Sequence, residues 1–261
     1  QTGMQTGQIV DAVLVGNTAM HHFFAGLPVH QLGASPYVPA VSEALLLRAD
    51  EVGLTFSPGM RVYLPANIAG YVGADHTAAL LSSRVYQDGT PQVLVDIGTN
   101  TEISLVHAGK IHSCSTASGP AFEGAHIRDG MRAAPGAIDS LHITQESVLV
   151  TTIEAAKPVG ICGTGILKAI SEMLDAGLLD ERGSLNRNDT RVRTIGRKTE
   201  FPLVSAGQSG HGREIAVTRK DVNEIQLAKG AIRSGIDILL AEAGLDASQV
   251  QHWVIAGAFG T

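Results

Sequence analysis

The chain has 261 residues, of which 44 % are hydrophobic and 17 % are charged, and its formal net charge is −6. This composition is typical of a folded protein with a large core and excludes a disordered chain. The acidic balance and the small number of aromatic residues argue against a nucleic-acid-binding surface, which needs clustered cations. The length fits either one large domain or two lobes.

Two cysteines, Cys114 and Cys162, are too few for a disulfide framework and too far apart in sequence for a zinc or iron–sulfur site. The sequence has no charged-then-apolar leader and no apolar run long enough to span a bilayer. We therefore expect a cytoplasmic protein without a membrane partner. Because the chain lacks an initiator Met and stops at Gly260-Thr261, directly after an apolar strand, we expect it to be a piece of a longer protein.

The first third of the chain predicts a strand, a helix and a long irregular connection. Asp11 to Val15 reads as a buried strand, and Thr18 can cap the helix that follows it. Residues 27–65 are rich in proline, and Arg61 to Leu64 is the next candidate strand. A helix is expected from Ala74 to Leu81.

Residues 93–105 contain the strongest candidate for a binding site. Val93 to Val95 predicts a buried strand that ends at Asp96, and a second strand begins at Glu102. Gly98 lets the backbone between these strands approach a ligand closely. This arrangement is suited to a phosphate group and its metal ion.

The side chains and amides of this turn supply the expected ligands. Asp96 can hold a hydrated Mg²⁺ ion, and Thr99, Asn100 and Thr101 can donate hydrogen bonds to phosphate oxygens. Alternatively, the turn is only a hairpin connection and Asp96 only caps it. These residues alone do not decide between the two interpretations.

Three short strands joined by tight turns, ending with 102–107 and 111–115, predict an antiparallel meander. This topology differs from a Walker phosphate loop, in which the Gly-rich segment enters a helix. The sequence also lacks the G-x-x-x-x-G-K-[ST], G-x-G-x-x-G and G-x-S-x-G patterns. Dinucleotide-binding and serine-hydrolase functions are therefore disfavoured.

The next segment, residues 117–138, is dense in Gly, Ala and Pro. Glu123, flanked by small residues, can act as a base that positions a water molecule or a metal-bound group. Alternatively, it is a carboxylate near the start of a helix, where the dipole favours negative charge. Arg128 and Arg132 have helical spacing and can meet a phosphate, or they lie on a solvated face.

A second Gly-rich loop, Gly163-Thr164-Gly165, opens an amphipathic helix. A helix N-terminus presents unpaired N–H groups to an anion, but glycines at this place also permit close helix packing. Residues 181–213 carry most of the local positive charge and predict an exposed excursion with one strand at Phe201 to Val204.

A long helix is expected to begin near Thr218, with a capping-box-like start. Trp253 to Ala256 predicts a further buried strand, and a third Gly-rich turn, 257–260, follows it directly. Such a turn suits the sugar or base of a nucleotide, because larger side chains would block its approach.

The order of these three turns resembles the acetate kinase, sugar kinase, heat-shock protein and actin superfamily (ASKHA), which has an α/β ribonuclease-H-like fold of mixed sheets flanked by helices. Within it, the chain resembles the C-terminal domain of the reductive activators of corrinoid proteins over nearly its whole length. The resemblance is carried by Val15-Gly-Asn-Thr-Ala-Met-His-His, Leu94-Val-Asp-Ile-Gly-Thr-Asn-Thr-Glu-Ile, Cys114-Ser-Thr-Ala-Ser-Gly-Pro-Ala-Phe-Glu-Gly-Ala, Gly130-Met-Arg-Ala-Ala-Pro-Gly-Ala-Ile, Gly160-Ile-Cys-Gly-Thr-Gly and Ile255-Ala-Gly-Ala-Phe-Gly.

The resemblance implies an ATPase that reduces Co(II) to Co(I) in a corrinoid methyl-transfer protein, with an N-terminal [2Fe-2S] ferredoxin-like domain in the intact molecule. By motif position, Asp96, Gly98, Thr99 and Asn100 match the second phosphate motif, with Asp96 near Mg²⁺. Gly257, Ala258 and Gly260 match the adenosine motif. The segment 163–165 is typical of the family, without an assigned contact.

The resemblance also implies a domain division and several departures. Residues 1–90 would be the remainder of a first lobe and its connection, and residues 91–261 the second lobe. We expect a partial copy of the fold, because the strands of the first phosphate motif, the cluster cysteines and a helix after Gly260 are not in this sequence. Thr101 stands where the family commonly has Gly. We therefore expect this chain alone to bind nucleotide weakly and to hydrolyse it slowly or not at all.

Two other functions fit the same residues. A small-molecule kinase of this superfamily would use Glu123 as the carboxylate facing an acceptor hydroxyl. A non-catalytic docking module would hold the corrinoid protein while its nucleotide site is vestigial. The apolar, Gly-rich composition is also compatible with a homodimer.

Overall fold

The computed structural model describes residue 3 and residues 5–257, and these divide into two compact units. Unit 1 contains the described residues up to Asp96, Glu102–Ser115 and those from Gly235 onward. Unit 2 contains Ile97–Thr101 and Thr116–Ser234. Across the described residues, no helix combines the length and the apolar character that a bilayer crossing requires.

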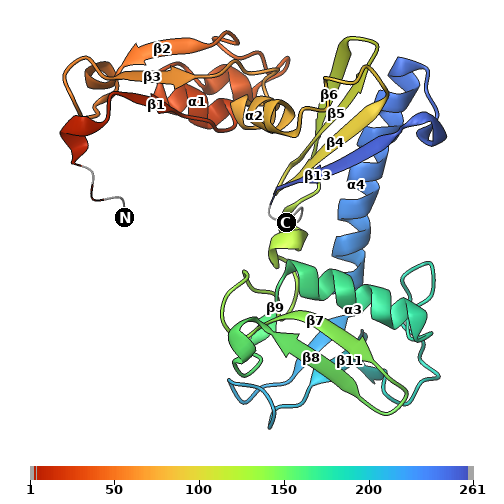
Figure 1. Ribbon diagram of the computed structural model, residues 1–261. Helices are drawn as coiled ribbons and strands as arrows, with labels where there is room; N and C mark the ends of the chain where they lie inside the picture. The colour runs from red at the N-terminus through yellow and green to blue at the C-terminus, as the bar shows by residue number, and fades with distance from the viewer. Residues whose placement is uncertain (1–2, 4, 258–261) are drawn as a thin grey trace. The chain divides into compact units, whose positions relative to one another are not determined.

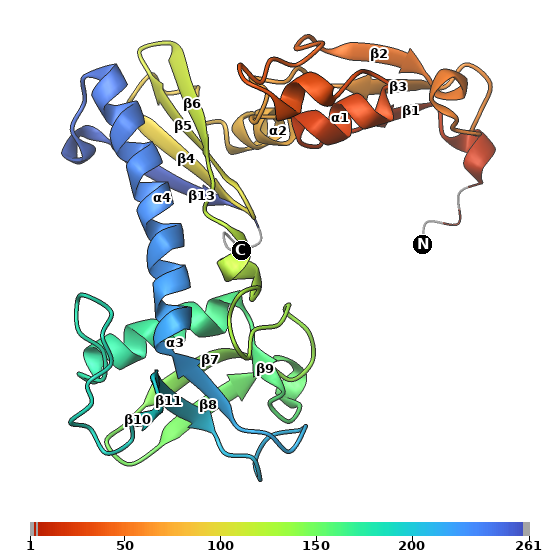
Figure 2. The same ribbon diagram turned by 180° about the vertical axis from the view of Figure 1, so that it is seen from behind.

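The N-terminal part of unit 1 is built on a three-stranded sheet with the order β1-β3-β2 (Figures 1 and 2). Its strands are β1 (Asp11–Val13), β2 (Leu45–Arg48) and β3 (Arg61–Leu64). β1 runs parallel to β3, and β2 runs antiparallel to it. The predicted strand is present as β1, at residues 11–13, but its predicted burial is wrong, because β1 lies at the edge of this sheet and Val13 remains 68 % exposed.

Two helices and three short 3-10 turns complete this part of the chain. They are η1 (Thr6–Gln8), α1 (Thr18–Phe24), η2 (His30–Gly33), η3 (Ala49–Val52) and α2 (Ala74–Ser83). Asn17, and not Thr18, caps α1, since its side chain accepts a hydrogen bond from the Met20 amide at 2.9 Å. The Thr18 hydroxyl instead donates to the Ala69 carbonyl, which ties α1 to the loop before α2.

The second sheet of unit 1 has the strand order β13-β4-β5-β6. Its strands are β4 (Gln92–Ile97), β5 (Thr101–His107), β6 (Lys110–Thr116) and β13 (His252–Ala256). Both views show the C-terminal part of α4 (Arg219–Ala243) along one face of this sheet (Figures 1 and 2). Leu80 and Val85 pack with Leu94 and Val106 in one buried cluster, which attaches α2 to β4 and β5.

Unit 2 contains two three-stranded sheets, with the orders β8-β7-β9 and β10-β11-β12. Helix α3 packs against β7. The elements are η4 (Pro120–Glu123), β7 (Ala137–Ile143), β8 (Val148–Thr152), η5 (Ile153–Ala155), β9 (Gly160–Ile161), α3 (Gly163–Asp175), β10 (Arg193–Ile195), β11 (Lys198–Val204) and β12 (Ile215–Thr218), while η6 (Ala247–Gln249) belongs to unit 1. The chain is therefore an α/β protein with mixed sheets flanked by helices.

The segment 181–213 is only partly the exposed excursion that its charge predicts. Its loops are exposed, but β11 is the central strand of its sheet, and Phe201, Leu203 and Val204 are buried. The strand predicted at Phe201 to Val204 is present as part of β11, but its exposure is not, because β11 pairs with β10 and β12 and also contacts β8, which local charge content does not reveal.

One buried histidine connects α2 to the second sheet of unit 1. The His76 side chain is fully buried, and its Nε2 lies 2.7 Å from the Ser104 hydroxyl on β5. The Ser104 hydroxyl in turn lies 2.6 Å from that of Ser113 on β6. Burial lowers the pKa of His76 to about 4, so this side chain is neutral at pH 7.

The stability of the chain should therefore depend on the protonation of His76. A lowered pKa in the folded state contributes stability above the unfolded value of 6.5, and this stability is lost as pH falls from 6.5 towards about 4. The loss corresponds to about 3 kcal/mol at most. Denaturant unfolding at several pH values should show this loss in the original chain and in a control with the exposed His30 changed to Gln. In His76→Gln the slope across this range should be clearly smaller, and an equal slope would contradict the assignment.

Candidate functional site

The register of β13 against β4 brings the ends of two strands to the same edge of the sheet, and in the sequence each of these strands is followed by a predicted nucleotide-binding turn. The strands are parallel, and Ala256 is the register partner of Asp96. Both strands therefore end together, and each is followed directly by its Gly-containing turn. Gly257 has a φ of 84°, in the left-handed region that favours glycine. Ala258 and Gly260 of the predicted adenosine motif lie outside the described residues.

Asp96 stands at the end of β4 in a negatively charged environment. Burial, together with the charge of Asp75 at the start of α2, raises the pKa of Asp96. Burial is also the main cause that raises the pKa of Glu102, and Asp75 and Asp96 add to it. A cation bound beside Asp96 would relieve this repulsion.

Asp96 would act as a single protein ligand to a metal ion. In the described part of the chain, no group of three or more His, Cys, Asp or Glu side chains is placed to hold one. Mg²⁺ commonly uses one or two carboxylates and completes its shell with water and phosphate oxygens. The position of Asp96 is thus compatible with the Mg²⁺ that its sequence motif predicts, provided that a phosphate ligand is present.

The negative charge of Asp96 should destabilise the protein when no ligand is bound. Changing Asp96 to Asn removes repulsion from a half-exposed site, where water screens the charge, so the free energy of unfolding should rise by about 0.5–1 kcal/mol at pH 7. The difference should shrink as pH falls through the folded-state pKa, because the original carboxyl then becomes neutral. Urea unfolding without nucleotide or metal measures this difference in the free energy of unfolding. The matched control is a chain in which the exposed Asp88 is changed to Asn. A destabilised Asp96→Asn chain would contradict the repulsion.

The turn after Asp96 is held by hydroxyl groups and by Glu123. The Thr99 hydroxyl donates a hydrogen bond to a carboxylate oxygen of Glu123, which ends η4. The Thr101 hydroxyl lies 2.8 Å from that of Ser118, and the Thr116 hydroxyl donates to the Thr101 carbonyl at 3.2 Å. The structure thus brings together Thr99 and Glu123, two residues that the sequence predicts separately.

These contacts divide the predicted phosphate ligands into two groups. The Thr101 side chain is fully buried and its hydroxyl is bonded within the protein, so it supports the turn and does not face a ligand. Thr99 and Asn100 are exposed, and Gly98 has its amide bonded to the Asn100 carbonyl at 3.2 Å. Sequence reasoning did not identify Ser118 as the partner of Thr101 or Asp75 as the neighbour of Asp96, although Ser118 lies in the Gly-rich segment 117–138 that it singled out.

The loop Gly163-Thr164-Gly165 forms the first turn of α3, as predicted. Gly165 is required for close packing, because a Cβ atom there would lie 1.9 Å from the Ile138 carbonyl oxygen on β7. Thr164 is exposed, and the N-cap residue Cys162 makes no side-chain cap. Since η4 packs against α3, unit 2 holds this loop and Glu123 on neighbouring elements.

The packing role of Gly165 can be tested against a second helical glycine. Gly165→Ala should destabilise the chain by about 2 kcal/mol or more, because the backbone of β7 or α3 must shift. Gly230→Ala in α4 meets nothing within 4 Å and should stabilise it by up to about 1 kcal/mol. Thermal or urea unfolding of both variants measures the contrast. Equal effects of the two substitutions would contradict the close contact.

Arg128, which the sequence analysis considered as a phosphate ligand, already has carboxylate partners. Arg128 forms ion pairs with Glu200 and with Asp129, so it is engaged in unit 2.

Burial, and secondarily the charge of Glu102, raises the pKa of the Cys114 thiol, which keeps it protonated at pH 7. Neither cysteine is in a disulfide.

Comparison with known proteins identifies the class of fold first. The chain has the ASKHA fold: residues 90–261 match the family model described as the C-terminal domain of RACo, the ASKHA domain. Residues 1–88 match the model of the RACo middle region. The chain belongs to the RACo C-terminal ASKHA family, and the predicted fold class and family are confirmed. The predicted extent of the C-terminal domain over nearly the whole chain is wrong, because residues 1–88 match the middle region.

Curated relatives and a solved structure agree with this assignment. The corrinoid activation enzyme RamQ of Eubacterium limosum is 34 % identical over 269 residues, which cover 100 % of this chain and 45 % of RamQ. The [Co(II) methylated amine-specific corrinoid protein] reductase of Methanosarcina barkeri is 28 % identical over 241 residues, covering 84 % of this chain and 41 % of the reductase. A solved "Reductive activator for corrinoid,iron-sulfur protein" superposes with a TM-score of 0.87 at 34 % identity, over 99 % of this chain and 42 % of that one. The chain thus spans less than half the length of each.

Proposed function

We propose that this chain is the ATP-binding part of a reductive activator that uses ATP to drive one-electron reduction of Co(II) to Co(I) in a corrinoid methyl-transfer protein. The observation that carries the proposal is the register of Asp96 with Ala256, which places the ends of the two strands that precede the phosphate and adenosine motifs at one sheet edge. The family membership and the names of the relatives, a corrinoid activation enzyme and a corrinoid protein reductase, support the same activity.

Most of the predicted site residues have a role in this proposal, while the buried Thr101 only supports the turn. Asp96 holds Mg²⁺, the Thr99 and Asn100 amides and the Asn100 side chain donate to phosphate oxygens, and Gly98 lets the backbone approach the phosphate closely. Gly257, with Ala258 and Gly260, leaves room for adenosine. When bound, Mg²⁺ supplies positive charge that offsets the phosphate charge.

Glu123 is the proposed general base. Its carboxylate accepts the Thr99 hydroxyl hydrogen bond, which orients it beside the phosphate turn. A carboxylate in this place can accept a proton from a water molecule that attacks the terminal phosphate. The loop 163–165 has no contact that assigns it to the nucleotide, and Gly165 is explained by packing, so we give it no role in hydrolysis.

Coupling between ATP and reduction requires that the nucleotide bind two conformations of the activator with different affinity. In the intact protein the electron would come from a [2Fe-2S] cluster in an N-terminal domain, and it would pass to the cobalt of the corrinoid protein. A homodimer and a cytoplasmic location belong to the same proposal. The division at residues 90 and 91 into two lobes remains a prediction.

The test is calorimetry with Mg-ATP, paired with a phosphate-release assay. For this chain alone we expect binding weaker than about 1 μM and slow or no turnover, and Asp96→Ala should abolish the binding that is present. In the intact protein, Glu123→Gln should lower turnover while binding is kept, because it removes only the base. Thr99→Val should lower turnover more than binding, since it removes the hydroxyl that orients Glu123 but keeps the backbone amide at this position.

One result would overturn the expected weakness of this chain alone, and two others would contradict the proposed function. Sub-micromolar binding with robust turnover that Asp96→Ala abolishes would overturn the expected weakness of this chain. Phosphoryl transfer to a sugar or acyl acceptor would indicate a small-molecule kinase. Capture of a corrinoid protein that neither ATP nor Asp96→Ala alters would indicate a docking module.

A further inference from the structure

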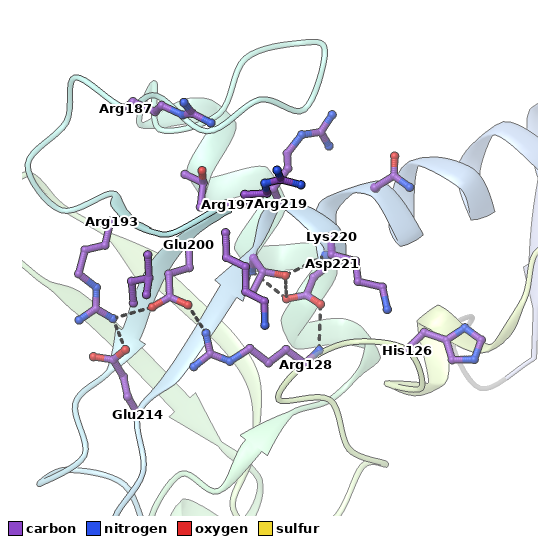
Figure 3. A pocket seen from close by; sticks show the side chains of 15 residues that line it. His126, Arg128, Arg187, Arg193, Arg197, Glu200, Glu214, Arg219, Lys220 and Asp221 are labelled. Carbon is purple, nitrogen blue, oxygen red and sulfur yellow. Dashed lines mark hydrogen bonds and ion pairs between the residues drawn. The ribbon is translucent and has the colours of Figure 1, made fainter.

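Unit 2 contains a large cavity with a strongly basic lining, beside the start of α4 (Figure 3). Its volume is about 960 Å³. Seven Lys and Arg residues line it against three carboxylates, an excess of four positive charges, although the whole chain has a net charge of −6. Seven of the 19 cationic side chains of an acidic protein are thus gathered around one cavity.

The carboxylates of the cavity are already engaged by protein groups. Glu200 is 5 % exposed and pairs with both Arg128 and Arg193, and Glu214 pairs with Arg193 (Figure 3). Asp221 is 1 % exposed and accepts hydrogen bonds from the Thr218 amide and hydroxyl and from the Arg128 amide. These contacts form a rigid base for the cavity.

The other cations have no such neutralisation. Within the described part of the chain, no carboxylate forms an ion pair with any of them: Arg187, Arg197, Lys198, Arg219 and Lys220. They come from three separate segments, namely the loop before β10, the β10–β11 turn and the start of α4. Like charges around one cavity repel, so a bound anion would stabilise this arrangement.

The lining also indicates the chemistry of the ligand. Ile195 is the one hydrophobic residue among the described lining residues, which include no Phe, Tyr or Trp. The cavity therefore has no platform on which a nucleobase or another flat ring could stack. Arginine presents a planar fork of donors that fits phosphate, and the volume lies within the range of small-molecule sites.

We propose that this cavity binds a small anion carrying two or more phosphate groups. Several groups are needed because the uncompensated cations surround the cavity and a single phosphate cannot reach all of them. The phosphate chain can belong to a free oligophosphate or to a nucleotide, which supply the same chemistry. The inference is independent of the ATP site at Asp96, because none of the residues proposed for that site lines the cavity.

The experiment is calorimetry of the whole chain with sodium tripolyphosphate, without divalent metal. The double variant Arg197→Gln/Lys198→Gln removes two exposed cations from the rim and should weaken binding by about tenfold or more, because it removes charge-assisted hydrogen bonds. Added salt should weaken binding of the original chain more steeply than that of the variant. The matched control, Arg61→Gln/Lys110→Gln, removes the same two residue types from exposed positions in unit 1 and should bind as the original does.

Parallel titrations distinguish the source of the phosphates and the alternatives. Asp96→Asn should bind tripolyphosphate unchanged, which separates this site from the proposed ATP site. If Arg197→Gln/Lys198→Gln weakens the binding of ATP as much as that of tripolyphosphate, a nucleotide is the source of the phosphates. If it weakens only the binding of tripolyphosphate, the source is a free oligophosphate. The proposal is overturned if tripolyphosphate does not bind, if the control pair weakens it equally, or if inorganic phosphate or a short polyglutamate peptide binds as tightly.

Discussion

The pairing of β13 with β4 is the constraint on which the candidate nucleotide site depends. The two strands are far apart in sequence, and a whole second unit is inserted between them. Because they are parallel and Ala256 is level with Asp96, the turns that follow them begin at the same edge. A slip of one residue would move every side chain of β13 to the opposite face of the sheet and would displace Gly257 from Asp96.

The phosphate turn itself is stabilised by polar contacts and opposed by charge. Ser118 and Thr116 hold Thr101 in place, while Glu123 receives the Thr99 hydroxyl. Such a polar network specifies one geometry when its members are satisfied. In contrast, the carboxylates around Asp96 repel one another in the absence of a cation. A hydrogen-bonded turn beside a carboxylate whose charge is unfavourable is typical of a binding site in which a bound cation compensates that charge.

In unit 2 the buried carboxylates are compensated, whereas several cations are not. Its buried carboxylates Glu200 and Asp221 are compensated by paired arginines, backbone amides and a hydroxyl, which makes their burial tolerable. Five cations of the segment 181–220 line the cavity without carboxylate partners among the described residues, namely Arg187, Arg197, Lys198, Arg219 and Lys220. The positive charge that appears in the sequence as a feature of an exposed segment is, in the folded chain, concentrated around one concave surface.

Much of the local structure and the family could be predicted from the sequence. The apolar run 93–95, the helix that begins at Gly163 and the long helix after Thr218 all have the expected type, because hydrophobic periodicity and caps act over a few residues. The residue types at the Gly-rich turns also indicated phosphate chemistry and the ASKHA family.

The tertiary structure alone decided which of these residues meet. That Thr99 bonds Glu123, that Thr101 is buried, and that β11 is covered on both edges depend on contacts between distant segments. The same is true of the register between Asp96 and Ala256. A sequence pattern reports the preferences of neighbouring residues, whereas strand pairing and the clustering of charges depend on how distant segments pack, so they became visible only in the folded chain.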